Sequence, residues 1–299
     1  MSSYEMDIPE EGLPVTPKRK RAKKHLSTGQ ILLYTLVAAM ACVVIVFLMF
    51  YLAGLRYIKI STEIGGYVKF FGTVDDNKAP YKGDLYYSDG TTAKVDMVAQ
   101  TVTFSNGDVY KGSLNYSLRM DGEGTLTYVT GDVYTGSFKD GVLSGTGRFE
   151  YANGDLYVGE FQNGKKDGEG VYTWFDGSTY DGHFSADKKQ GFGTYRWSDG
   201  SYYTGSYADD LKDGTGTYHY ANGDIYSGTF LKDERSGHGT YTWANGDEYD
   251  GSFAKNEMNG HGVYRFASGR TFDGTFSNGA LVRDSDETPT DEEIPDTVG

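Results

Sequence analysis

The sequence of 299 residues contains a single cysteine, Cys42, which lies within an uncharged run. A disulfide needs two cysteines, and a structural zinc site built on thiolates needs several. The rest of the chain therefore has neither a disulfide framework nor a thiolate metal site. The scarcity of cysteine excludes these two ways of stabilising a fold, but it excludes no cellular compartment.

Histidine is also scarce, and the five histidines do not converge in the sequence. His238 and His261 occupy one position in adjacent repeats, where an intervening strand would keep them about 10 Å apart. Solvated side chains explain these two histidines better than a bridging metal. The Gly-x-Gly pairs lack the third glycine and the helix that a dinucleotide site needs, and no Ser/His/Asp constellation is evident. The sequence therefore predicts no catalytic residue, no metal and no cofactor.

Positive charge is scarce over most of the chain, whose formal net charge is −14. Residues 1–56 hold seven Lys or Arg and four Asp or Glu, so residues 57–299 hold 21 and 38, a balance of −17. A body this acidic is repelled by phosphate backbones and by anionic lipid headgroups. We therefore expect neither nucleic acid nor anionic lipid headgroups among its partners.

Charge is absent altogether from residues 31–55, which read ILLYTLVAAMACVVIVFLMFYLAGL. As a helix this run would be about 37 Å long, enough to span a bilayer. A cleaved signal peptide would have a shorter apolar core and a small-residue cleavage site. The basic run KRKRAKKH at residues 18–25 precedes it, and an excess of positive charge stays cytoplasmic. We expect an uncleaved single-pass membrane anchor, with the N-terminus cytoplasmic and the repeats extracytoplasmic.

Tyrosine and glycine, in contrast, are abundant, with 26 and 42 copies. Aromatic residues favour strands and glycine favours turns. An aromatic residue recurs every 23 residues, at Tyr134, Tyr157, Tyr180, Tyr203, Tyr226, Tyr249 and Phe272. A glycine follows each of them two residues later, and a Gly-x-Gly pair stands within the units. A fixed period of this length is typical of repeat proteins, in which each unit packs against its neighbours.

The stretch from Tyr157 to Gly170, YVGEFQNGKKDGEG, resembles the MORN (membrane occupation and recognition nexus) repeat. The consensus of that repeat is roughly Y-x-G-x-[WF]-x-x-G-x-x-x-G-x-G, with a closing glycine further on. The resemblance extends over most of the chain. It implies a β-hairpin repeat protein that serves as a scaffold, a membrane-associated adaptor or a dimerisation element.

These patterns divide the chain into five segments. They are a disordered cytoplasmic tail with a basic flank (1–28), a transmembrane helix (29–56), a short linker (57–69), the repeat array (70–282) and an acidic disordered tail (283–299). The array holds about nine to ten units, and the second unit, Ala93 to Val109, is truncated. Both tails are poor in large apolar residues, which is why we expect them to be disordered.

The spacing of two residues within each unit is the period of a β-strand, so alternate residues share one face of the sheet. Across the turn that follows Phe161, the expected pairs are Tyr157–Tyr172, Gly159–Gly170 and Phe161–Gly168. Across a three-residue loop, Ala152 to Gly154, they are Phe149–Tyr157, Gly147–Gly159 and Gly145–Phe161. The sequence thus predicts an all-β fold: an elongated single-layer antiparallel β-meander of 23-residue hairpins after one transmembrane α-helix. About 19 strands would make a sheet roughly 90 Å long.

One face of this sheet carries rows of aromatic rings alternating with glycines. We expect it to be the partner-binding face, formed by Tyr134, Phe138, Tyr151, Tyr157, Phe161, Tyr172, Trp174, Tyr180, Phe184, Tyr195, Trp197, Tyr203, Tyr207, Tyr220, Tyr226, Phe230, Tyr241, Trp243, Tyr249 and Phe253. The glycines expected to leave space for these rings are Gly136, Gly145, Gly147, Gly159, Gly168, Gly170, Gly182, Gly191, Gly193, Gly205, Gly214, Gly216, Gly228, Gly237, Gly239, Gly251, Gly260 and Gly262.

A long aromatic surface suits recognition. The sequence predicts a membrane-anchored, non-enzymatic interaction or scaffold module that binds a protein, a peptide or a second copy of itself. The alternative is a cell-envelope or glycan-binding surface protein, because tyrosine and tryptophan also stack on sugars. Aspartates follow the closing glycines at Asp132, Asp155, Asp224 and Asp247, and such a series would bind calcium only loosely. Turn chemistry explains these aspartates better than a calcium site.

Overall fold

A computed structural model of the chain describes residues 26–62 and 65–282. Within these ranges the chain has one helix and 21 strands. It separates into two units, residues 1–53 and 54–299, which are described one at a time below. The basic run at residues 18–25, most of the expected N-terminal tail and the acidic tail at residues 283–299 lie outside the described residues.

The helix α1 covers Thr28–Leu52. Ser27 caps its first turn: the Ser27 hydroxyl accepts a hydrogen bond from the backbone N–H of Gln30 at 3.3 Å, and the Gln30 side chain accepts one from the N–H of Ser27 at 3.0 Å. Gly54, with a φ of +76°, follows the helix and allows the chain to turn away. All side chains of α1 are exposed, and by length and composition the helix is able to cross a membrane.

The strands are short and regular. The first ten are β1 (Leu55–Ser61), β2 (Tyr67–Val74), β3 (Pro80–Tyr87), β4 (Thr92–Asp96), β5 (Thr101–Phe104), β6 (Val109–Leu114), β7 (Met120–Thr127), β8 (Val133–Lys139), β9 (Val142–Glu150) and β10 (Leu156–Gln162). The others are β11 (Lys165–Thr173), β12 (Thr179–Ser185), β13 (Lys188–Arg196), β14 (Tyr202–Ala208), β15 (Leu211–His219), β16 (Ile225–Leu231), β17 (Glu234–Thr242), β18 (Glu248–Ala254), β19 (Glu257–Arg265), β20 (Thr271–Ser277) and β21 (Ala280–Leu281).

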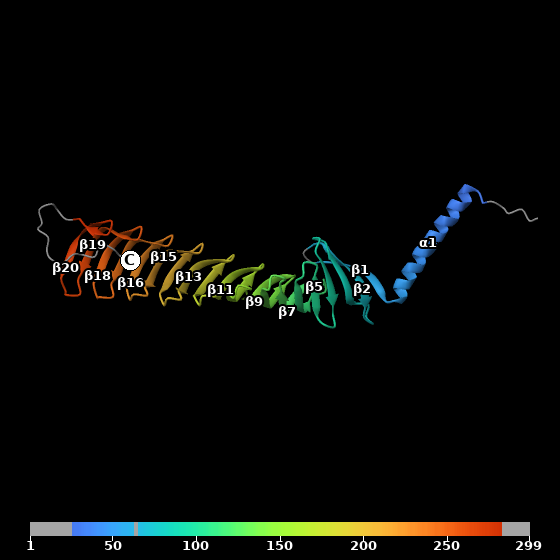
Figure 1. Cartoon of the computed structure of the whole chain (residues 1–299), viewed down its shortest axis with the longest axis horizontal. Helices are drawn as coiled ribbons and strands as arrows, with labels where there is room; N and C mark the ends of the chain where they lie inside the picture. Colours follow the sequence, from blue (N-terminus) through green and yellow to red (C-terminus); the bar gives the residue numbers. More distant parts are fainter. Residues whose placement is uncertain (1–25, 63–64, 283–299) are drawn as a thin grey trace, which may run out of the picture. The chain divides into compact units, whose positions relative to one another are not determined.

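Each strand pairs antiparallel with the next one in the sequence, so the sheet is a single open meander (Figure 1). At about 4.8 Å per strand, the row of strands is roughly 100 Å long. The predicted all-β, single-layer fold with one preceding helix is confirmed. The sheet begins at Leu55, earlier than the residue 70 at which we expected the array. Ile58 and Ile60 of β1 pack against the hydrophobic core, which explains why these residues join the sheet.

The expected register is confirmed across the three-residue loop. Tyr157 pairs with Phe149, and the glycines at 147 and 159 face each other. The backbone N–H of Tyr151 donates to the carbonyl oxygen of Asp155 at 2.9 Å, which closes the loop. Gly154 has a φ of +94°, a conformation that most other residues avoid.

Across the other turn, the prediction that Phe161 pairs with Gly168 is wrong. Tyr157 pairs with Tyr172 as expected, but Phe161 pairs with Lys166. Asn163 and Gly164 form a two-residue turn with positive φ angles of 52° and 79°, the conformation that favours Asn-Gly in tight hairpins. A bulge in β11 then takes up the extra residues, with Gly168 at a φ of +110°. The bulge brings Lys166, not Gly168, beside Phe161.

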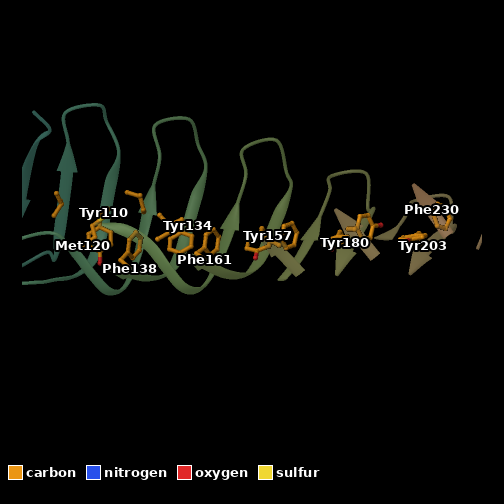
Figure 2. Close-up of a cluster of buried hydrophobic side chains, with 14 of the residues drawn as sticks. Tyr110, Met120, Tyr134, Phe138, Tyr157, Phe161, Tyr180, Tyr203 and Phe230 are labelled. Atoms are coloured by element: carbon orange, nitrogen blue, oxygen red, sulfur yellow. The ribbon is translucent and has the colours of Figure 1, made fainter. Parts of the chain in front are cut away.

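The core of the sheet is a row of tyrosines that lie over paired glycines. Tyr157 is fully buried, and its ring covers Gly159 and Gly170 so closely that an added Cβ at Gly170 would lie 2.6 Å from the ring. The labelled rings of successive units follow one another along the sheet in Figure 2. The missing side chains of the glycines therefore make the space in which the tyrosine rings are buried.

Candidate functional site

The twenty residues of the expected binding face separate into two groups by burial. Thirteen are buried: Tyr134, Phe138, Tyr157, Phe161, Tyr180, Phe184, Tyr203, Tyr207, Tyr226, Phe230, Tyr241, Tyr249 and Phe253. Seven are partly exposed: Tyr151, Tyr172, Trp174, Tyr195, Trp197, Tyr220 and Trp243. All but Tyr241 of the buried group form one continuous series, which we call the inner row.

In the inner row, each tyrosine ring packs between two other rings. The ring centroid of Tyr157 lies 5.1 Å from those of Phe161 and Phe184, with nearly perpendicular planes. The Tyr157 hydroxyl donates a hydrogen bond to the backbone oxygen of Glu160 at 3.0 Å. Burial raises the pKa of the equivalent Tyr134 to about 12. These rings contact one another and their own strands, so their main role is to hold the sheet together.

A second series of rings runs beside the inner row, and we call it the outer row. It consists of Tyr128, Phe149, Tyr151, Tyr172, Trp174, Tyr195, Trp197, Tyr218, Tyr220, Tyr241, Trp243, Tyr264 and Phe266. Neighbouring ring centroids are between 4.3 and 5.8 Å apart, and most ring planes are tilted against each other. Most of these rings are partly exposed. The outer row is the continuous aromatic surface that this face presents to solvent.

The face also carries positive charges that sequence analysis missed. The residue brought beside the inner row by the bulge recurs every 23 residues, as Met120, Leu143, Lys166, Lys189, Lys212, Arg235, Met258 and Leu281. The four central members are cationic, and we call Lys166, Lys189, Lys212 and Arg235 the cation row. The members at both ends of the series are apolar.

Each member of the cation row is surrounded by rings. The Lys166 ammonium lies 4.8 Å from the ring centroid of Tyr172 and 5.7 Å from those of Tyr157 and Phe184. These distances are within the range of cation–π attraction. Burial lowers the pKa of Lys166, although the nearby carboxylates of Asp187 and Asp210 oppose the effect. The cations therefore lie between the inner and the outer row.

Two signals in the sequence would have located the cation row. The dipeptide Asn163-Gly164 is a strong indicator of a two-residue hairpin turn, and that turn places Lys166 across from Phe161. The 23-residue spacing then assigns Lys189 and Lys212 to the same position. A turn of six residues, 162–167, would assign that position to Gly168 instead.

The aspartates of the Gly-Asp turns connect neighbouring units. Asp224 Oδ1 accepts a hydrogen bond from the backbone N–H of Ala244 at 2.8 Å, and its Oδ2 accepts one from the Tyr241 hydroxyl at 2.7 Å. Burial acts to raise the pKa of Asp224, but these hydrogen bonds outweigh it and keep the pKa below its usual value. Because the carboxylate is occupied by the protein itself, turn chemistry accounts for this aspartate.

The two repeated histidines contact aspartates on the neighbouring strand. His238 Nε2 lies 3.5 Å from Asp250 and His261 Nε2 lies 3.0 Å from Asp273, and both histidine side chains are more than two-thirds exposed. Within residues 26–62 and 65–282, no group of three or more His, Cys, Asp or Glu side chains is arranged to hold a metal ion.

Comparison with known protein families gives one match, the MORN repeat. Seven consecutive copies match, at residues 119–133, 134–156, 157–179, 180–202, 203–225, 226–248 and 249–269. These residues make up half of the chain. None of the curated proteins is similar enough in sequence to count as a match.

Two solved structures are similar to this chain, both at low identity and low TM-score. One is the TCP domain of SAS-4 (dCPAP) of Drosophila melanogaster with a proline-rich motif of Ana2 (dSTIL); it is 14% identical, the match covers 69% of this chain and 96% of that one, and the TM-score is 0.27. The other is the TCP10 domain of Danio rerio CPAP with a peptide of STIL, with 14% identity, 74% and 100% coverage and a TM-score of 0.23. At such TM-scores these likenesses carry no conclusion about what this chain binds.

Proposed function

Because this chain belongs to the MORN repeat family, we propose that it is a non-enzymatic interaction module that binds an extended protein segment along the outer row and the cation row. The module is held at a membrane by α1. The observation that carries this proposal is the continuous series of partly exposed rings with cations beside it. Aromatic rings supply apolar contact area, and fixed charges give the contact direction and specificity.

An extended segment suits this face better than a sugar does. A sugar stacks on the free face of a ring, whereas neighbouring rings of the outer row cover part of each other's faces. The centroids of Tyr195 and Trp197, for example, lie 4.4 Å apart. The rings repeat once in every unit of two strands and so form a linear series. An extended chain can follow this series along the exposed ring edges.

The membrane arrangement follows from the charge on either side of α1. Six basic residues lie in the run at 18–25, before the helix, whereas Arg56 and Lys59 are the nearest ones after it. The excess of positive charge favours a cytoplasmic N-terminus and an extracytoplasmic sheet. The acidic balance of residues 57–299 agrees with a sheet that does not lie on anionic headgroups.

Peptide display against the full chain in lipid nanodiscs tests the binding function. We expect selected peptides to lose about tenfold or more in affinity when Trp174 and Trp197 are both replaced by alanine, since aromatic anchors dominate such interfaces. Phe192→Ala is the matched control, because Phe192 is an exposed aromatic residue on the opposite face of the sheet. Peptides that bind equally well to both variants would contradict the proposed binding face.

Protease treatment of intact cells tests the orientation. A C-terminal epitope tag should be removed without permeabilisation if the sheet is extracytoplasmic. A tag that survives until the membrane is opened would reverse the orientation, and the binding partner would then be sought in the cytoplasm.

A further inference from the structure

The cation row is not required by the fold. The same position is occupied by Met258, which is fully buried, and by Leu143, and the sheet continues through both units. Burying an ammonium group is more costly than burying a methionine side chain of similar length. Four consecutive units nevertheless carry a cation there. The charge therefore serves a purpose other than packing.

Among the described residues, two of these ammonium groups have carboxylates nearby but none close enough to form an ion pair. Lys166 and Lys189 contact aromatic rings, but neither ammonium group has an ion pair or a hydrogen bond. Lys212 lies 4.0 Å from Asp233, at the limit of an ion pair. One carboxylate oxygen of the nearby Asp187 accepts a hydrogen bond from the backbone N–H of Lys166 at 2.9 Å. The row therefore has capacity for further carboxylates.

The chain itself contains an acidic segment. Residues 283–299 read RDSDETPTDEEIPDTVG, with seven acidic residues and one arginine. Its acidic residues are Asp284, Asp286, Glu287, Asp291, Glu292, Glu293 and Asp296. In a body with an excess of acidic residues, this segment is repelled by most surfaces of its own chain. The cation row occupies the same repeat position as Leu281, which lies two residues before the segment begins.

The segment also starts in line with the row and is long enough to follow it. Leu281, in β21, is the last member of the 23-residue series to which the cations belong. Arg235 lies four strands away in β17 and Lys166 ten strands away in β11, which is roughly 19 Å and 48 Å at about 4.8 Å per strand. Seventeen extended residues reach about 56 Å at roughly 3.3 Å each. The segment therefore has the length to pass all four cations.

We propose that residues 283–299 bind along the cation row of their own chain and cover the outer row until a partner displaces them. This inference rests on the proposed binding function of the same face. Carboxylates of the segment accept hydrogen bonds from the ammonium groups, while Pro289, Ile294 and Pro295 contact the partly exposed rings. Because the segment is tethered, its effective concentration is on the order of millimolar, so weak contacts are sufficient.

The three tryptophans of the protein allow a direct test, because Trp174, Trp197 and Trp243 all belong to the outer row. A bimane label on Thr297→Cys, in a full chain with Cys42→Ala in lipid nanodiscs, is quenched when it contacts a tryptophan. We expect its fluorescence to be about twofold lower than in a chain with Asp291→Asn, Glu292→Gln and Glu293→Gln. A segment whose Kd for the row is below its effective concentration, on the order of millimolar, is docked in more than half of the molecules.

A matched pair of lysine variants identifies the site. Lys166→Met with Lys189→Met should restore the fluorescence, since methionine occupies this position naturally at Met258. Lys165→Met with Lys188→Met changes the net charge equally but alters exposed lysines on the opposite face, and it should leave the quenching unchanged. Unchanged circular dichroism verifies that both variants fold.

Three results would overturn the proposal: no quenching in the full chain, quenching that both pairs of variants relieve equally, or quenching that disappears on dilution. The last result would assign the segment to a second copy of the chain. Peptide binding by a chain shortened to end at Val282 tests the proposed function separately. If that chain binds selected peptides while the label is never quenched, only the inference about the segment fails.

Discussion

The regular units and the short hairpin β4–β5 solve the same packing problem in two ways. In a regular unit, the glycine pair Gly159–Gly170 leaves room for the ring of Tyr157. In the short hairpin, Val95 pairs with Val102, and at most 2% of the surface of either residue is exposed. The volume above the sheet is filled in both regions, in one by the ring of a residue two positions from the glycine and in the other by the side chains of the paired residues themselves. Tyrosine and the glycine pair therefore form a single packing unit.

The largest effect is expected when a valine is introduced into the regular region. Gly170→Val would place its side chain where the Tyr157 ring lies, with the Cβ 2.6 Å from ring carbons. We expect the free energy of unfolding to fall by about 3 kcal/mol or more. Chemical denaturation of the full chain in detergent, followed by tryptophan fluorescence, measures this loss.

The short hairpin, in which valines replace the glycine pair, supplies the control. Adding Tyr157→Ala to Gly170→Val should recover part of the lost stability, because the valine then fills the space of the ring, as in the short hairpin. The reverse change, Val102→Gly, should cost about 2 kcal/mol by leaving a cavity. Strictly additive effects of Tyr157→Ala and Gly170→Val would refute the idea that ring and glycine form one packing unit.

The next-largest effect is expected at alkaline pH, where the regular units should lose stability. The pKa of Tyr134 is raised by burial to about 12, so the folded state keeps a proton that the unfolded state loses near pH 10. This contribution to stability is complete below pH 10 and is lost as the pH rises to about 12, at about 1.4 kcal/mol per pH unit for one proton. Tyr134→Phe should reduce the slope of stability against pH above 10. An unchanged slope would show that Tyr134 titrates normally.

A smaller effect is expected for the aspartates of the turns. Asp224→Ala removes hydrogen bonds to the next unit and should cost about 2 kcal/mol. Asp96, in the short hairpin, accepts hydrogen bonds from the backbone N–H groups of Val98 and Ala99, which are within three residues of it, and pairs with the exposed Lys82, so Asp96→Ala should cost less. The pKa of Asp224 lies below its usual 3.8, so its advantage over the alanine variant should fade as the pH falls below that value. Equal losses at both aspartates would contradict the inter-unit role.

The smallest effect on stability is expected in the cation row. Lys189→Met should raise the free energy of unfolding at pH 7, by less than about 1 kcal/mol. Burial lowers the pKa of Lys189 from 10.5, so the cost of burying its charge is present at neutral pH and disappears as the pH approaches 10.5. The two proteins should therefore converge at alkaline pH. A large loss of stability in Lys189→Met would mean that the fold itself needs the charge.

Much of the fold was predictable from the spacing of residues. The 23-residue period and the two-residue period within it predicted the strands and the register at Tyr157–Tyr172. The same reasoning was wrong at Phe161. The bulge there leaves the two-residue alternation intact on both sides, so the spacing of residues does not reveal it. The candidate site was predicted only in outline for this reason: the rings were located, but the cations between them were not.

The sequence by itself determined the uncharged helix, the hairpin repeat and the face to which each aromatic residue belongs, since these depend on local periodicity. Only the tertiary structure decided which rings are buried and which remain exposed, because burial depends on the neighbouring units that cover each ring. It also decided that Lys166 lies among aromatic rings, since a tight turn and a bulge compensate each other there. Such compensation arises between two strands and leaves no mark on the periodicity of either strand alone.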